Sequence, residues 1–237
     1  AFTRHRLKAD VSVTEWLSAH VVYDNDVRYG VIDTLESDLG SGFRSQSFLD
    51  AESGISEGEH HDWNHQLYRG YVQIETERFE LAVGRQRIAW GVGRLWNPID
   101  RFSALPPLSL QPDQTPGIDS IDGRFKSDRF NYLQFVYAPG ASGRDERWAV
   151  RLHGVLWDAD LSVMGGVFEK APTVGVAFSR TLWDGAIGFE AVYTAPEHKF
   201  WELGDPAPTT PSDYWQVVAS FEINLDFGTG VYFLTEY

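Results

Sequence analysis

Three polar residues, Gln216, Ser220 and Glu222, are interleaved with apolar ones in the stretch Trp215-Gln216-Val217-Val218-Ala219-Ser220-Phe221-Glu222-Ile223. Every second side chain from Trp215 to Ile223 is apolar, and a β-strand places such positions on one face of its sheet. The same period of two residues recurs in 2–13, 147–157 and 186–194, whereas the 3.6-residue period of an amphipathic helix is nearly absent. The chain is therefore predicted to be all-β.

Composition limits the classes of function. The chain has 237 residues, a formal net charge of −14 and no cysteine. A chain without cysteine forms no disulfide, no thiolate metal site and no cysteine nucleophile. The acidic balance argues against nucleic acid as a partner, because a nucleic-acid binder needs a basic face. No segment approaches the ~18 successive apolar residues of a membrane-spanning helix.

Alternation of this kind is also typical of a β-sandwich, which stands as the alternative to a membrane barrel. Three features favour the barrel. The polar positions carry many full charges, as a water-filled interior permits, and the connections alternate between short and long. Aromatic residues also occupy strand ends on the apolar positions, as at the membrane interfaces of outer-membrane barrels. These aromatics are Tyr23, Tyr68, Phe79, Tyr137, Trp148, Tyr193, Trp215 and Tyr237.

The connections predict the orientation of the strands in the membrane. Short turns such as Glu77-Arg78 and Asp184-Gly185 alternate with long connections, the pattern of periplasmic turns and extracellular loops. We predict a single domain, 1–237: an all-β, transmembrane, antiparallel up-and-down β-barrel in the cell outer membrane. About twelve strands are expected, at 2–13, 18–26, 66–76, 79–90, 119–127, 130–138, 147–157, 160–169, 173–183, 186–194, 214–223 and 229–237.

Strand direction adds an expectation about completeness. The first strand runs into a short turn and the last leaves one, so both chain ends would be extracellular. A complete bacterial barrel keeps both termini periplasmic and has an even number of strands, so we expect a barrel of fourteen or more strands that is incomplete here at both ends. A strand count that is off by one at each end, or strands supplied by another chain, are the alternatives.

Two of the long connections differ in character. The connection 27–65 is expected to be an acidic extracellular loop, since nine acidic and two basic residues lie between Asp26 and Asp62. The connection 91–118 is rich in Gly and Pro, and its prolines exclude a strand ladder. It is also too apolar to remain in water, so we expect it to fold into the barrel lumen. Its apolar residues include Leu95, Trp96, Ile99, Phe102, Leu105, Leu108 and Leu110.

The start of this connection carries a resemblance to a known family. The motif Gly84-Arg85-Gln86-Arg87-Ile88-Ala89-Trp90-Gly91, followed by Arg94-Leu95-Trp96-Asn97-Pro98, resembles one found in porin-like outer-membrane barrels of Gram-negative bacteria. Its Gly-Arg-Gln portion is similar to a signature of alginate-export-type barrels. The resemblance is close over 81–120 and elsewhere extends only to the general barrel pattern. It implies an outer-membrane channel with an inward-folded, constricting loop, and it identifies no solute.

The arginines of the motif admit two interpretations. In the structural one, Arg85 and Arg87 bond loop carbonyls and carboxylates such as Asp100, Asp113 or Asp119. In the functional one, their guanidiniums line a constriction that binds anionic or polyhydroxylated solutes. Both arginines share the strand face of Leu81 and Val83, which otherwise points to lipid, and an arginine at the lipid midplane costs roughly 2–4 kcal/mol. Either a bulge at Gly84 reverses the face, or these residues lie above the hydrocarbon.

Charged residues on the polar face outline a possible pore. Bases gather in the first seven expected strands, and acids such as Glu190 and Glu222 are more prominent later, which would produce a transverse field if the two halves face each other. The alternative is a plugged lumen in which the charges neutralise one another. Small residues at Ser162, Gly166 and Ala177 leave room for a loop or plug. The candidate pore or constriction residues are Arg85, Arg87, Arg94, Arg101, Arg4, Arg6, Lys8, Arg69, Arg124, Arg147 and Arg151.

Signals for other chemistry are weak. His60, His61 and His65 have residue types that suit a divalent metal, but an exposed acidic loop explains them as well, and we predict no metal and no other cofactor. His153, Asp160 and Ser162 contain the residue types of a hydrolase triad, yet nothing in barrel geometry requires them to meet. We therefore expect no enzyme activity.

The leading hypothesis is passive transport of small polar or anionic solutes through a porin-like channel. The alternative is a structural barrel that sheathes or docks a partner protein in an outer-membrane complex. The expected partners are the lipid bilayer, a small solute and other subunits of such a complex. The solute, the full strand number and the oligomeric state do not follow from the sequence.

Overall fold

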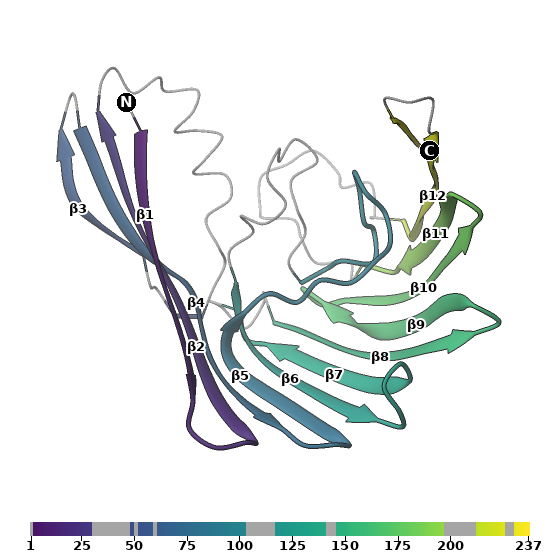
Figure 1. Cartoon of the computed structure of the whole chain (residues 1–237), viewed down its shortest axis with the longest axis horizontal. Helices are drawn as coiled ribbons and strands as arrows, with labels where there is room; N and C mark the ends of the chain where they lie inside the picture. The colour runs from purple at the N-terminus through teal and green to yellow at the C-terminus, as the bar shows by residue number, and fades with distance from the viewer. Residues whose placement is uncertain are drawn as a thin grey trace.

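The computed structural model describes residues 2–29, 48–49, 52–58, 61–102, 117–140, 146–196, 212–225 and 230–237. Within these ranges it forms one curved antiparallel sheet (Figure 1). The strands are β1 (Phe2–Ser12), β2 (Leu17–Tyr29), β3 (Glu52–Gly58), β4 (His61–Glu75), β5 (Phe79–Gln86), β6 (Ile118–Lys126), β7 (Tyr132–Ala138), β8 (Arg147–Leu156), β9 (Ala159–Phe168), β10 (Ala171–Leu182), β11 (Gly185–Thr194), β12 (Tyr214–Leu225) and β13 (Val231–Glu236).

The order of strands follows the chain. Twelve strands form one path from β1 to β13 in chain order, in which β2 pairs with β4, and β3 lies off this path, paired with β4. The prediction of an all-β, antiparallel, up-and-down sheet is confirmed. In the described part of the chain no pairing joins β1 to β13, and the expected barrel of fourteen or more strands stays a prediction. No helix in the same residues is long and apolar enough to cross a membrane.

The predicted loop 27–65 is wrong in its bounds. β2 continues to Tyr29, β4 already begins at His61, and β3 pairs with β4 between them. Beyond the apolar part of the sheet both faces of a strand can be polar, so no alternation marks these extensions in the sequence. Main-chain pairing alone extends the ladder here, from Arg28↔Asp62 to Tyr29↔His61.

The end of β5 also differs from the prediction. The strand was expected to reach residue 90 but ends at Gln86. Residues 87–102, here called the inward segment, leave the sheet and cross the inside of its curve (Figure 1). Gly84 takes a φ of +128°, a conformation that glycine adopts most readily, and a Cβ at this position would lie 2.4 Å from the carbonyl oxygen of Gly70.

The two faces of the sheet differ in side-chain chemistry. On β7, Gln134 and Val136 are buried under the inward segment, whereas Leu133 and Phe135 at the intervening positions are exposed. β10 repeats this pattern, with Thr173 buried and its neighbour Val174 exposed. The face that carries the inward segment is the concave face, and the opposite, convex face is the more apolar of the two.

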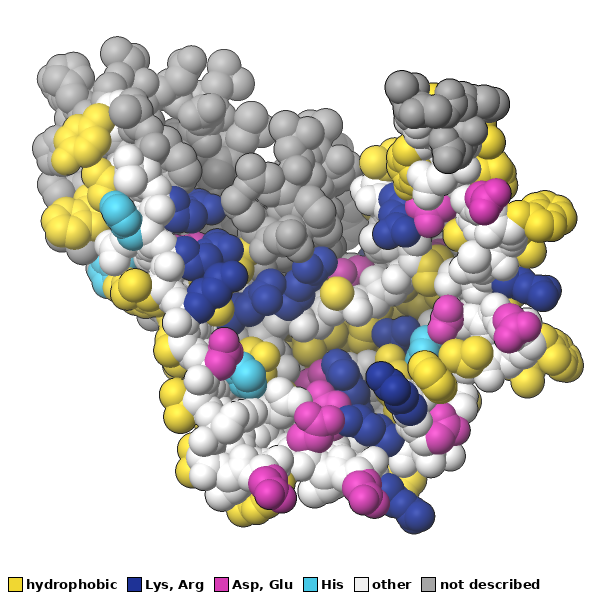
Figure 2. Space-filling model, viewed as in Figure 1, with side chains coloured by type: hydrophobic (Ala, Val, Ile, Leu, Met, Phe, Trp, Pro, Cys, Tyr) yellow, Lys and Arg dark blue, Asp and Glu magenta, His cyan; other side chains and the backbone are white. Residues whose placement is uncertain are grey.

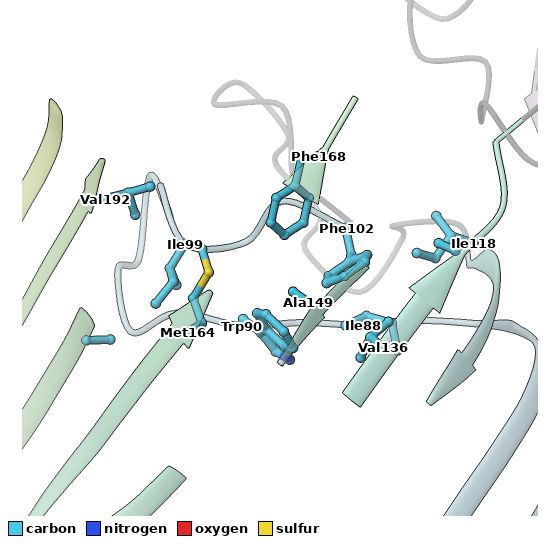
Figure 3. Packing of buried hydrophobic residues seen from close by; sticks show 12 residues of the cluster. Ile88, Trp90, Ile99, Phe102, Ile118, Val136, Ala149, Met164, Phe168 and Val192 are labelled. Atoms are coloured by element: carbon cyan, nitrogen blue, oxygen red, sulfur yellow. The ribbon is translucent and has the colours of Figure 1, made fainter. Parts of the chain in front are cut away.

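An apolar cluster lies between the inward segment and the concave face (Figure 3). Trp90 meets Phe102 edge to face, with ring centroids 5.2 Å apart, and Phe102 meets Phe168 of β9 at 5.1 Å. Ile99 is fully buried. The wall opposite is built from small and medium side chains, as the sequence indicated at Ala177. The remaining members of the cluster are Ile88, Ile118, Val136, Ala138, Ala149, Met164 and Val192.

Candidate functional site

The inward segment is attached to β11 by a buried carboxylate. Glu190 has no exposed surface, and its Oε1 accepts hydrogen bonds from the main-chain N–H groups of Val92 and Gly93, the latter at 3.0 Å. Its Oε2 accepts a third from Ile99 N–H at 3.2 Å. Main-chain donors to an ionised carboxylate are among the stronger hydrogen bonds in proteins. Gly91 passes so close that a Cβ there would lie 2.7 Å from Glu190 Oε1.

Two further carboxylates hold the tip of the inward segment. Glu236 of β13 accepts from the N–H groups of Arg94 and Trp96, each at 2.8 Å. Glu222 of β12 forms a two-pronged ion pair with the Arg94 guanidinium, with Nη2 to Oε1 at 2.8 Å and Nε to Oε2 at 3.0 Å. We call Glu190, Glu222 and Glu236 the acidic wall. Sequence reasoning placed Glu190 and Glu222 on the polar face but missed Glu236, since nothing in its local pattern marks a loop contact.

These contacts revise the expected transverse field. The acids of the later strands do not face the opposite bases across open space, because all three bind the inward segment. The field was inferred from the order of charges along the chain, and that order did not reveal that a loop between the two halves would take up the acids.

Two candidate pore arginines anchor the other end of the inward segment. The Nη2 of Arg101 donates to Thr194 Oγ1 at 2.9 Å and to Gln216 Oε1 at 2.6 Å. The Nη1 of Arg147, on β8, donates to the carbonyl oxygens of Phe102 at 3.2 Å and Arg101 at 3.4 Å. With Arg94, they hold the segment in place, and their donors are directed at the protein itself.

Arg85 is buried in a structural ion pair. Its guanidinium bonds the Asp119 carboxylate at 3.1 Å and the carbonyl oxygens of Leu67 and Leu49 at 3.2 and 2.5 Å. The β5–β6 register runs through Gly84 without a shift, so no bulge reverses the strand. The Leu49 N–H bonds the same carboxylate at 2.8 Å, and this covering main chain shields Arg85. The structural interpretation therefore holds for Arg85, which is not open to solute.

Three more candidates are paired with carboxylates on their own or a neighbouring strand. Arg4 and Arg6 of β1 form two-pronged pairs with the aspartates opposite them on β2, Asp26 at 2.7–2.8 Å and Asp24 at 2.6 Å. Arg124 contacts Asp122 at 3.0 Å and Glu80 at 3.5 Å. The idea that charges on the polar face neutralise one another applies to this group.

Arg69, Arg87 and Arg151 have no carboxylate partner among the residues that the structure describes, and we call them the three unpaired arginines. Arg69 lies 5.5 Å from the centre of the Tyr68 ring, and Arg151 lies 5.6 Å from that of Trp90. Arg151 Nη2 also donates to His153 Nδ1 at 3.3 Å. The Nε of each of the three is buried without a hydrogen-bond partner. Lys8 is exposed on β1.

Within its described residues, the structure does not assemble the weak metal and hydrolase candidates into a site. His60 lies outside the described residues, and His65 Nδ1 is bonded to the Tyr23 hydroxyl. In the described ranges no group of three or more His, Cys, Asp or Glu side chains is placed to hold a metal ion. His153 faces Ser162 in the β8–β9 register and lies 3.9 Å from Asp160, but no described hydrogen bond joins it to the serine.

A cavity of about 370 Å³ remains between the inward segment and β10–β12. Its lining is largely polar and includes Arg94, Arg180, Ser179, Ser220 and Glu222. Gly188 also lines it, and a Cβ at this glycine would lie 3.3 Å from Val92 Cγ2. The inward segment thus narrows the space on the concave face but does not fill it.

No protein-family model and no curated protein matches this sequence. Among solved structures, the chain is similar to OmpT, an outer membrane protein of Vibrio cholerae that was folded in vitro and is in its trimer form. The sequence identity is 11% and the TM-score 0.48, and the match covers 100% of this chain and 80% of that one.

Proposed function

We propose that this chain forms the wall of an outer-membrane β-barrel that lets small polar or anionic solutes pass by diffusion. One observation carries the proposal: large apolar side chains are exposed on the convex face, while charged side chains gather on the concave face (Figure 2). A soluble protein arranges these classes the other way round. Examples on the convex face are Leu7, Val72, Phe135, Leu152, Val163, Val174 and Val217.

The extent of the apolar face is what favours a membrane. Soluble monomers rarely expose a contiguous apolar patch larger than a few hundred Å², yet exposed Leu, Val and Phe side chains recur here on strands from β1 to β13. Removing such surface from water is worth roughly 25 cal/mol per Å², which lipid contact would supply. A β-sheet crosses a membrane only as a barrel, since a barrel pairs its main-chain groups internally.

Tryptophans at the short turns also support a sheet whose convex face contacts lipid. Trp157 and Trp183 are 81% and 93% exposed, each at the end of a strand. Both adopt left-handed backbone conformations, with φ of 54° and 51°, which cost a residue with a side chain roughly 1–2 kcal/mol. A ring with an apolar body and an N–H donor is most stable where lipid meets water, so interfacial contact would offset this cost.

Planar-bilayer recording tests the proposal. The purified protein, added to one side of a bilayer, is expected to produce discrete conductance steps, because the polar concave face would enclose water beside the inward segment. A bilayer that stays sealed at every voltage and salt concentration, with protein shown to be inserted, rejects the channel.

A second candidate function is favoured by the apolar cluster. The inward segment fills part of the concave face with side chains such as Trp90, Ile99 and Phe102, as expected of a barrel that serves as a structural sheath or dock for a partner protein. This function predicts stable copurification with that partner and no conductance. A purified barrel that is alone and conducts ions contradicts it.

A further inference from the structure

We infer that Arg69, Arg87 and Arg151 are solute-binding positions and that the solutes they select are anions, carboxylates in particular. This inference rests on the proposed channel and deepens it, because it names the residues and the class of solute. Its basis is the set of partners that the basic side chains of the concave face already bind.

Most of the candidate bases are already occupied. Arg4, Arg6, Arg85, Arg94 and Arg124 are paired with carboxylates, and Arg101 and Arg147 donate to groups on or beside the inward segment. In a channel these side chains contribute less to the attraction of an anion, since either their charge is paired or their terminal nitrogens are bound to the protein, even though the Nε of Arg101, Arg124 and Arg147 has no partner. The three unpaired arginines are what remains of the partly buried bases.

The surroundings of the three unpaired arginines leave them available to a ligand. Each is partly exposed, and each has a buried Nε that lacks an acceptor, a feature shared with Arg101, Arg124 and Arg147. What distinguishes the three is their terminal nitrogens, for which the described residues supply one hydrogen bond, from Arg151 to His153. A buried donor without a partner is unfavourable, so an oxygen of water or of a solute is expected beside it. One nearby acid, Asp122, is already engaged by Arg124 and Gln134, at 3.0 and 2.8 Å.

The chemistry of the guanidinium indicates a carboxylate. Its planar fork of N–H donors matches the two oxygens of a carboxylate, and it stays charged at every physiological pH. The contact of Arg151 Nη2 with His153 Nδ1 also fixes that histidine nitrogen as the acceptor, because a guanidinium has no acceptor of its own. Arg151 therefore keeps Nε and Nη1 for a ligand.

The positions of the three residues suit transfer from site to site. Arg69 lies on β4, Arg87 directly follows β5, and Arg151 lies on β8. Adjacent strands are about 4.8 Å apart, so β4 and β8 are separated by roughly 20 Å along the sheet. Several separate binding positions allow a solute to enter and leave more readily than one deep site.

Reversal potentials in a potassium chloride gradient test the selectivity. The unaltered protein is expected to favour chloride, and the triple variant Arg69→Gln, Arg87→Gln, Arg151→Gln to bring the ratio of anion to cation permeability toward unity. The matched control removes three exposed turn charges, through Arg78→Gln, Arg129→Gln and Lys170→Gln, and should keep the original ratio. A cation-selective unaltered channel, or an equal change in the control, overturns the inference.

Citrate binding separates this inference from the channel proposal. Calorimetry on the protein in detergent micelles should show that Arg151→Gln weakens citrate binding about tenfold or more, the factor expected for one lost charge-assisted hydrogen bond. Arg151→Lys should keep the charge and still bind citrate less well, because it loses the planar fork. Citrate binding without conductance rejects only the channel, whereas conductance with citrate binding that is absent or insensitive to Arg151 rejects only the inference.

Discussion

The acidic wall and the three unpaired arginines lie on the same concave face, yet they differ in what they bind. Glu190 and Glu236 each accept hydrogen bonds from three main-chain N–H groups of the inward segment. Arg69, Arg87 and Arg151 have no comparable partner in the described part of the chain. Glu190 and Glu236 thus hold a piece of the protein, whereas the three unpaired arginines hold none of the described inward segment.

This difference shows that the role of a charged residue depends on whether the main-chain groups beside it still lack hydrogen-bond partners. An acid beside a loop with free N–H groups becomes an anchor, because such groups must find acceptors when they are buried. A basic side chain beside strands whose carbonyl groups are already paired in the ladder finds no free main-chain acceptor and does not act as an anchor. Variants that remove each kind of contact therefore test this difference.

The largest effect is expected at Arg85, a basic residue that behaves like the anchors of the acidic wall. Arg85→Met leaves the buried Asp119 carboxylate without its cation, and breaking a buried pair in this way typically costs about 3–5 kcal/mol. The free energy of unfolding in detergent should fall by that amount in denaturant titrations. Arg69→Met is the matched control, since its loss leaves no buried carboxylate behind, and an equal loss in both variants would erase the distinction between the two classes of arginine.

Glu190→Gln should release part of the inward segment. The amide keeps one acceptor oxygen for three N–H donors and turns its NH₂ group toward at least one of them. An unsatisfied buried donor costs roughly 1–3 kcal/mol, so we expect faster tryptic cleavage after Arg94 and Arg101 and a larger single-channel conductance. Glu15→Gln, in an exposed turn, should change neither measurement. If Glu190→Gln leaves cleavage and conductance unaltered, the carboxylate is not what holds the segment.

The sequence predicted the sheet well because alternation has a direct physical cause. Each strand has an apolar face and a more polar face, and β7 and β10 show this residue by residue. β3 and the first residues of β4, 61–65, were missed because their pairing rests on main-chain hydrogen bonds, which leave no mark in side-chain polarity.

The candidate site was predictable only in part. The sequence predicted an inward course for 91–118, and 91–102 follow it, whereas 103–116 lie outside the described residues. Ala177, one of the small residues expected to receive the loop, lies in the apolar cluster. The partners of the arginines were not, because they depend on contacts between residues far apart in the chain, such as Arg94 with Glu222. Counting bases on a face therefore overestimated the charge available to a solute.

A smaller effect is expected where the acidic wall reaches solvent. The Arg94 side chain is 59% exposed, and pairs this open typically contribute about 0–1 kcal/mol. Glu222→Gln should lower the free energy of unfolding by no more than this and leave cleavage after Arg101 unchanged. A loss as large as that of Glu190→Gln would mean that the tip and the buried part of the segment are held equally firmly.

The smallest effect is expected outside both groups, in the turn at Asp128. Its carboxylate accepts from the Asn131 side-chain amide at 2.7 Å and from the main-chain N–H groups of Phe130 and Asn131 at 2.9 Å, and these bonds lower the pKa of Asp128. The bonded form is thus favoured above the ordinary pKa of about 3.9, and the added order is lost as pH falls through the lowered value. Hydrogen exchange at the Phe130 amide should therefore lose protection in acid in the unaltered protein, whereas Asp128→Asn should show no such dependence. This turn touches neither the inward segment nor the unpaired arginines. The ratio of anion to cation permeability should therefore be the same in both proteins at neutral pH. A change in that ratio would show that charge at the rim of the sheet, rather than on the concave face, sets the preference for anions.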